Sequence, residues 1–195
     1  MAKDVEIGSL KVRTIGSGAN KVRVVLLPGH EFGIEHFLPE NLRVEDKRGR
    51  VTKVTSLGGS KFLSFFRRSS TFFSKTSSLY PFLLPLSELR LARYLNKLQL
   101  PGLRAEEPLA ALLHADGSCS VLYREVKGKQ LTTFGNHDNF LRLRALARQL
   151  GDKGVTAGDI SSGNVFRDKR GNLSVIDLEF WRVREKLKKQ LKLTK

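Results

Sequence analysis

Short strand-like runs dominate the first two thirds of the chain: some alternate apolar and polar residues, and others are continuously apolar and bounded by turn residues. The runs cover residues 5–15, 21–27, 51–54, 61–68, 109–114 and 119–125. Glycine-containing turns connect the members of several pairs, as they do in β-hairpins. This part of the chain is therefore predicted to be built from paired strands.

Two segments have the helical period instead. Ser87 has the side chain of an N-cap, and the leucines that follow it recur on one helix face. Glu88 then falls in the first turn, where the helix dipole favours a carboxylate. A second helix is predicted over residues 138–150, with Gly151 placed to end it.

Residues 154–182 have the pattern of loop, strand, turn and strand, and they carry Asp159, Asn164 and Asp177. Such a hairpin can bring three polar side chains together. Two carboxylates and an amide oxygen are suitable ligands for Mg²⁺ or for the metal of a bound nucleotide. The alternative is ordinary turn chemistry, because Asp and Asn are common in loops. The order of the three residues, with a Gly-Asn turn between the last two, favours a site.

Two other stretches carry candidate chemistry. The turn around Gly16 and Gly18 could cradle phosphates with its backbone amides, although a simple hairpin connection is the favoured interpretation. Residues 28–50 contain two histidines and several glutamates, without the spacing of a helical metal site. Histidines in a loop without a metal are therefore the favoured interpretation there.

Charge suggests the kind of partner. The chain has 35 Lys+Arg against 19 Asp+Glu, a formal net charge of +16. Such a balance suggests nucleic acid, anionic lipid or a phosphorylated glycan, or else simply a basic, well-solvated exterior. The basic residues 183–195 are predicted to form a helix, which is either a solvated tail or a contact for a membrane surface or an acidic partner. Phe pairs interleave with basic residues over 65–75, but adjacent Phe residues suit burial better than base stacking.

The remaining composition limits the chemistry. Cys119 is the only cysteine, which excludes an intramolecular disulfide and Cys-based zinc sites. No apolar run resembles a signal peptide or reaches the length of a membrane span. We therefore expect a cytoplasmic protein, with peripheral contact to the inner face of the cytoplasmic membrane as a further expectation.

Asp159 followed by Asn164, and then Val175-Ile176-Asp177, resembles the pattern of protein-kinase-like phosphotransferases. The similarity is in particular to the small bacterial lipopolysaccharide core kinases that phosphorylate heptose or Kdo sugars. The resemblance implies an α+β, two-lobed protein-kinase-like fold. Its N-lobe would be an antiparallel sheet within residues 1–126, and its small, mainly helical C-lobe would cover residues 127–195.

The same resemblance implies roles for individual residues. Asp159 corresponds to the catalytic aspartate, and Asn164 and Asp177 to the residues that hold Mg²⁺ bound to ATP. Glu88 corresponds to the helix glutamate that pairs with the lysine of the nucleotide site. That lysine is expected at Ser64, and Lys61, three residues earlier, lies on the opposite face of an unbroken strand. Three alternatives follow: the lysine belongs at another register of the strand, Lys61 or the neighbouring Arg67 substitutes for it, or nucleotide binding is weakened.

Three hypotheses follow for function. The first is an ATP-dependent kinase acting on a sugar hydroxyl of the lipopolysaccharide inner core, an anionic glycolipid. The second is a pseudokinase or binding module, which Ser64 favours, as does Ala157 in place of the histidine that usually lies two residues before the catalytic aspartate. A nucleic-acid-binding protein is the third and least favoured.

Overall fold

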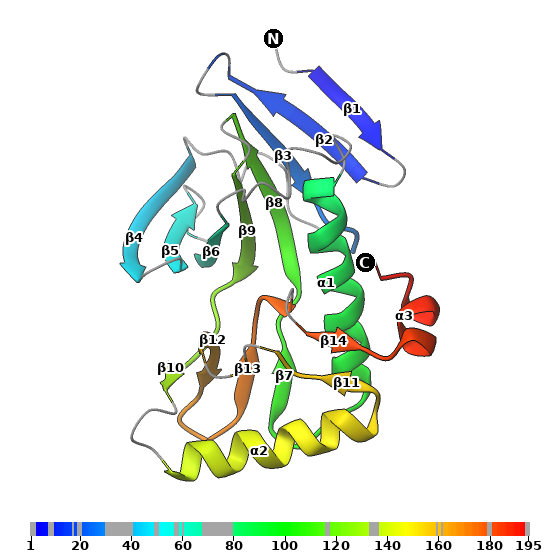
Figure 1. Ribbon diagram of the computed structural model, residues 1–195. Helices are drawn as coiled ribbons and strands as arrows, with labels where there is room; N and C mark the ends of the chain where they lie inside the picture. The colour runs from blue at the N-terminus through cyan, green and yellow to red at the C-terminus, as the bar shows by residue number, and fades with distance from the viewer. Residues whose placement is uncertain are drawn as a thin grey trace. The chain divides into compact units, whose positions relative to one another are not determined.

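Eight strands form one sheet in the computed structural model (Figure 1). They are β1 (Lys3–Ile7), β2 (Leu10–Ile15), β3 (Val22–Leu26), β4 (Leu42–Arg48), β5 (Val51–Ser56), β6 (Lys61–Arg67), β8 (Pro108–His114) and β9 (Cys119–Arg124). Their order is β1-β2-β3-β8-β9-β6-β5-β4, and every neighbouring pair is antiparallel. Residues 5–15 were predicted as one run and instead form two strands, β1 and β2, which pair with each other, and β4 lies in a segment predicted as loop. The strands predicted from the other strand-like runs are confirmed.

The structure describes residues 3–7, 10–16, 18, 21–29, 41–48, 51–56, 59, 61–67, 80–115, 118–132, 137–158, 160, 162–178 and 181–193. The histidines and glutamates of residues 30–40 lie outside this part, as does the Phe- and Arg-containing segment beyond Arg67. In the part of the chain that the structure describes, no helix is both long and apolar enough to cross a membrane.

Apolar side chains on the central strands of the large sheet are buried and pack against one another. Val24, Ala110 and Leu122 have no exposed surface and belong to one apolar cluster with Val54 and Leu112. Burial of such side chains is the main favourable term in folding. Cys119 is also buried, 3% exposed, as expected for a small core residue.

The remaining strands form two smaller sheets. One has the order β10 (Lys129–Thr132), β12 (Ser162–Arg167), β13 (Leu173–Val175) and β7 (Leu103–Ala105). The other pairs β11 (Val155–Thr156) with β14 (Arg182–Val183). Three helices complete the fold: α1 (Tyr80–Lys97), α2 (His137–Asp152) and α3 (Glu185–Leu191).

The chain divides into two compact units. The first comprises residues 1–86 and 108–125, and the second comprises residues 87–107 and 126–195. The chain passes from one unit to the other inside α1, and passes for the last time between Glu125 and Val126, beside the division predicted at residue 126. The fold is therefore α+β, with an antiparallel-sheet unit and a second unit that combines helices with small sheets.

Helix α2 packs on the smaller four-stranded sheet. Leu143, Leu146 and Leu150 share a buried cluster with Val165 of β12 and Val175 of β13. The predicted end of this helix is wrong by two residues, because α2 continues through Gly151 to Asp152. The left-handed conformation that ends it belongs to Gly154, with φ +82°.

Helix α1 begins seven residues before the predicted N-cap. It starts at Tyr80 and contains Pro85, so Ser87 and Glu88 lie inside the helix and not at its start. A proline interior to a helix removes one backbone hydrogen bond, which is why the sequence pattern placed the start after it. From Ser87 onward the helix contributes Leu91 and Leu95 to the core of the second unit.

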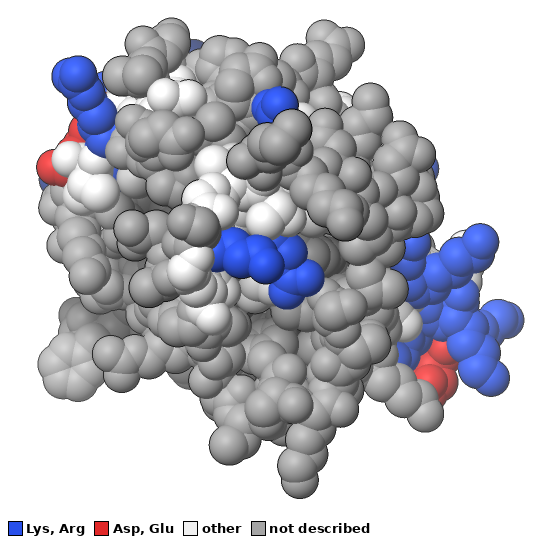
Figure 2. All heavy atoms as spheres, turned by 90° about the horizontal axis from the view of Figure 1, so that it is seen from above, with Lys and Arg blue, Asp and Glu red and all other residues white. Residues whose placement is uncertain are grey.

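Helix α3 is short, basic and attached to its own unit. Leu187 and Leu191 are partly buried against the second unit's core, so the segment is not a solvated tail along its apolar side. Its lysines face outward, and Figure 2 shows Lys and Arg side chains gathered at the edge of the molecule where α3 lies.

Candidate functional site

The hairpin formed by β12 and β13 brings two of the three predicted polar residues together. Val165 lies opposite Val175, and the backbone N–H of Ile176 donates to the carbonyl oxygen of Asn164 at 2.9 Å. Asn164 is 4% exposed and Asp177, the residue after Ile176, is 1% exposed. An amide and a carboxylate are thus buried at one end of the hairpin, on directly adjacent parts of the backbone.

The backbone conformation of Asp177 changes the direction of the chain at this point. In a regular strand, Asp177 would point to the face opposite Ile176, and therefore away from Asn164. Asp177 instead has φ +56°, one of three non-glycine residues with positive φ in the described part of the chain. Asp tolerates this left-handed conformation better than most residues, and strained backbone of this kind is concentrated at functional sites. The hairpin therefore ends its regular alternation at the residue predicted to bind metal.

Gly163 fixes the backbone on the other side of Asn164. It has φ +92°, and a Cβ at this position would lie 2.8 Å from Nε2 of Gln130. That nitrogen donates a hydrogen bond to the carbonyl oxygen of Gly163. The pairing of β10 with β12 is irregular here, between Gln130 and Thr132. Glycine is favoured because of the positive φ, and a side chain here would also displace the amide of Gln130 from its hydrogen bond.

The turn between β12 and β13 is held by Asp168. Its Oδ1 accepts hydrogen bonds from the backbone N–H groups of Arg170 and Asn172, both at 2.8 Å, and its Oδ2 accepts one from Nδ2 of Asn172 at 2.9 Å. The side-chain bond from Asn172, helped by the backbone N–H donors, lowers the pKa of Asp168 below its ordinary value. The turn is thus a closed hydrogen-bonded unit, which fixes the register of the strands that carry Asn164 and Asp177.

Asp159 lies outside the described residues, so its catalytic role stays a prediction. Ala157, which stands where the resemblance implies a histidine, is partly buried against the apolar core of the second unit. At this position the chain therefore has a packing residue.

Glu106 is a buried carboxylate near the hairpin that the sequence did not single out. Its backbone N–H donates to the carbonyl oxygen of Val175 at 2.8 Å, which continues the parallel pairing of β7 with β13. Glu106 is 8% exposed, and its Oε1 lies 2.9 Å from Nε of Arg104. Continuing the two pairings places Asn164, Ile176 and Glu106 in one row across the sheet, where neighbouring side chains point to the same face. Strand β7 is only three residues long, which is too short for a sequence pattern to predict that Glu106 lies beside the hairpin.

The structure does not bring Gly16 and Gly18 close to Lys61, although all three were predicted to bind the nucleotide. Gly16 and Gly18 both have positive φ, and their turn joins β2 to β3, which pair directly. That is the favoured hairpin connection. Strands β8 and β9 separate β3 from β6, where Lys61 lies, which corresponds to about 14 Å of sheet. The glycine turn and Lys61 are therefore far apart, and phosphate binding by Gly16 and Gly18 stays a prediction.

Lys61 and Glu88 belong to different units. The Lys61 side chain is 56% exposed, and its Nζ lies 3.9 Å from Oε2 of Glu45. Strand β6 pairs with both neighbours without a bulge, so the backbone shows no shift of register between positions 61 and 64. Glu88 is 3% exposed within α1. The pairing of Lys61 with Glu88 stays a prediction.

The chemistry of Asn164 and Asp177 fits a hard divalent cation. Mg²⁺ prefers oxygen ligands and is usually held by one or two carboxylates, with waters and phosphate oxygens completing its shell. Among the described residues, no group of three or more His, Cys, Asp or Glu could hold a metal without such help. The pair therefore suits a metal that arrives with a phosphate-bearing ligand better than a permanent structural ion.

Comparisons with known proteins give no family assignment. No protein-family model matches the chain, and no curated protein matches it in sequence. The solved structure of the Cydia pomonella granulovirus kinase PK-1 aligns with 14% identity over 75% of this chain and 54% of that one, with a TM-score of 0.42. The yeast RNA polymerase II CTD kinase complex CTDK-1 aligns with 13% identity over 74% of this chain and 47% of that one, with a TM-score of 0.44.

Both matched structures are described as kinases. The chain spans about half the length of each. Similarity this low assigns neither an activity nor a substrate. The candidate site therefore rests on the hairpin itself.

Proposed function

We propose that this protein is an ATP-dependent phosphotransferase that phosphorylates a sugar hydroxyl of the lipopolysaccharide inner core. The observation that carries the proposal is the buried pair of Asn164 and Asp177, adjacent across a hairpin, with a left-handed backbone at Asp177. Two oxygen-bearing side chains in this arrangement match what a phosphate-bound Mg²⁺ requires. The protein-kinase-like sequence pattern around them supplies the reaction class.

Each residue then has a role. Asn164 and Asp177 would hold Mg²⁺, which when bound offsets the negative charge of the ATP phosphates. Asp159 would orient the acceptor hydroxyl and accept its proton. Glu88 and Lys61 are the proposed anchors of the nucleotide, with Gly16 and Gly18 as further candidates.

The choice of an anionic acceptor is supported by charge. The chain carries a net charge of +16, and α3 has three lysines on a seven-residue helix. A lipopolysaccharide core carries carboxylates and phosphates close to a membrane, where a cationic surface is attracted. We propose peripheral contact with the cytoplasmic face of the membrane for the same reason.

A pseudokinase or binding module with the same fold is the second candidate. It is favoured by Ser64 at the place expected for the phosphate-anchoring lysine and by the packing role of Ala157. In this case the protein would bind Mg²⁺ and nucleotide, or the glycolipid alone, without transfer.

The experiment that separates them is phosphate transfer from radiolabelled ATP to deacylated lipopolysaccharide core, with Asp159→Asn as the test variant. We expect label in the glycan with the wild type, at least about a hundredfold less with Asp159→Asn because the base is lost, and unchanged nucleotide binding in both. Asp152→Asn, an exposed carboxylate at the end of α2 that lines neither the hairpin site nor a pocket beside it, serves as the control and should keep the activity. Nucleotide binding without transfer would favour the pseudokinase, and full transfer by Asp159→Asn would show that another residue is the base.

A further inference from the structure

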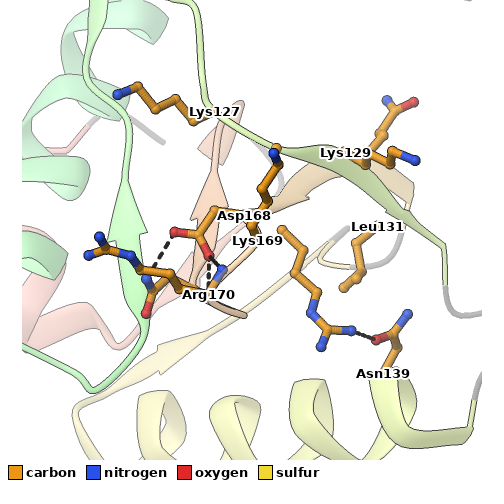
Figure 3. Close-up of a pocket in the computed structure, with 11 residues that line it drawn as sticks. Lys127, Lys129, Leu131, Asn139, Asp168, Lys169 and Arg170 are labelled. Atoms are coloured by element: carbon orange, nitrogen blue, oxygen red, sulfur yellow. Dashed lines mark hydrogen bonds between the residues drawn. The ribbon is translucent and has the colours of Figure 1, made fainter.

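The second unit contains a basic cavity that the proposed reaction does not use. It has a volume of about 1050 Å³ and lies at the turn between β12 and β13 (Figure 3). Among the described residues that line it, Asp168 is the one acidic residue. Five are cationic: Lys127, Lys129, Arg167, Lys169 and Arg170. The cavity therefore carries an excess of positive charge within a small volume.

The backbone brings these cations together in a defined way. Lys129 pairs with Arg167 across β10 and β12. Gly128 has φ +124°, and a Cβ there would lie 2.2 Å from the carbonyl oxygen of Arg167. Only glycine permits so close an approach, and this approach sets Lys127 and Lys129 beside the turn that carries Lys169.

Most of the positive charge is available to a ligand. None of the salt bridges in the described part of the chain includes Lys127, Lys129 or Lys169. The carboxylate of Asp168 is directed into its own turn, where Asn172 and backbone N–H groups surround it, as the dashed lines of Figure 3 show. It therefore does not form an ion pair with the lysines around it.

One cation is held rigidly in the wall. Nη1 of Arg167 donates to Oδ1 of Asn139, at 3.0 Å, and Asn139 is 6% exposed in the first turn of α2. The remaining guanidinium N–H groups are suited to bidentate binding of a phosphate or carboxylate. An arginine oriented by a hydrogen bond, with further cationic residues in the same lining, is an arrangement that can bind phosphate groups.

The cavity is separate from the Asn164 and Asp177 pair. Asn164 and Arg167 are three positions apart on β12, and an odd spacing places their side chains on opposite faces of the strand. Arg167 is on the face covered by α2, as its bond to Asn139 requires. A ligand in the cavity would therefore not occupy the proposed metal site.

We propose that this cavity is a second binding site, specific for the phosphate groups of an anionic ligand. The proposal does not depend on phosphoryl transfer or on a divalent metal. The same phosphate chemistry is found in soluble phosphorylated compounds and in the headgroups of anionic lipids, and the experiment has one arm for each.

The test compares two double variants with equal changes of charge. Lys129→Glu with Lys169→Glu reverses two cavity lysines, and Lys97→Glu with Lys153→Glu reverses two exposed lysines of the same unit that do not line the cavity. Binding is measured without divalent metal, to inorganic pyrophosphate by calorimetry and to vesicles of equal parts phosphatidylcholine and phosphatidylglycerol by co-sedimentation. Melting curves confirm that both variants fold.

We expect the cavity variant to lose at least about tenfold in affinity for one of the two probes, because charge-assisted hydrogen bonds are lost there. The control variant should lose less than about threefold through its effect on net charge. A selective loss for pyrophosphate identifies a soluble phosphate ligand, and a selective loss for vesicles identifies a lipid headgroup. Equal losses in the two variants, or no binding of either probe by the wild type, would overturn the proposal.

Discussion

At the scale of single residues, backbone conformation decides what the hairpin can do. Asp177 is buried and has φ +56°, so the chain leaves regular strand geometry just after Ile176, whose backbone N–H is bonded to Asn164. A left-handed non-glycine residue costs of the order of 1 kcal/mol, and the surrounding structure must compensate for that cost. The conformation is therefore a feature that the fold maintains at this residue.

Gly128 offers a direct test of a close backbone approach. Gly128→Ala should lower the free energy of unfolding by at least about 2 kcal/mol, because φ is +124° and the new Cβ would lie 2.2 Å from a carbonyl oxygen. The control is Gly151→Ala in α2, where nothing lies within 4 Å of the added Cβ. That variant should be neutral or more stable by up to about 1 kcal/mol. Urea unfolding of both proteins measures the difference, and equal stabilities would contradict the approach.

Asp168 should make the stability of the hairpin depend on pH. Its pKa is lowered in the folded protein by the bond from the Asn172 side chain and by backbone N–H donors. A lowered folded pKa stabilises the protein above the carboxyl's unfolded value, and the contribution is lost as pH falls through the folded value. Asp168→Asn should therefore melt below the wild type at neutral pH, and the gap should close on acidification. A gap that stays constant from neutral to strongly acidic pH would contradict this account.

Some of these residue-level features could be predicted from the sequence and some could not. The hairpin that brings Asn164 close to Asp177 along the chain's return follows from a Gly-Asn turn between two short apolar runs, which is a local signal. The left-handed backbone at Asp177 and the neighbour Glu106 depend on how β7 pairs with β13, and residues 105 and 175 are far apart in the chain. Such contacts have no signature in the spacing of residues.

At the scale of elements, periodicity predicted the strands and missed the start of a helix. Helix α1 contains Pro85, and a rule that ends helices at proline placed its start at Ser87, seven residues late. Strands β7 and β10 were missed because three or four residues are too few to show an alternation. Glu88 consequently lies inside a helix, buried, and not in a first turn.

The attachment of α3 can be tested by its leucines. Leu187→Ala should lower the free energy of unfolding by about 1 kcal/mol or more, because the side chain is partly buried against the core of the second unit. Lys186→Ala, one position away and exposed, should change it by less than about 0.5 kcal/mol. Chemical unfolding of the two variants gives both values. Similar small effects would mean that the helix is a solvated tail after all.

At the scale of the whole molecule, charge and fold are separate properties. The net charge of +16 affects the solubility of the protein and favours binding partners of negative charge. It does not determine the eight-stranded sheet. The two units each have their own apolar cluster. Among the described residues, positive charge gathers at α3 and at the cavity beside the β12–β13 turn, both in the second unit. The anionic ligand proposed above would bind this unit.

The central claim is that Asn164 and Asp177 hold the metal of a bound nucleotide. Its most direct test is electron paramagnetic resonance of Mn²⁺, titrated with the protein in the presence of ATP. The wild type should immobilise Mn²⁺ only when ATP is present, and Asp177→Asn should weaken this binding by at least about tenfold. Asp152→Asn, an exposed residue at the end of α2, should leave it unchanged. Binding of equal strength in the wild type and Asp177→Asn would contradict the claim.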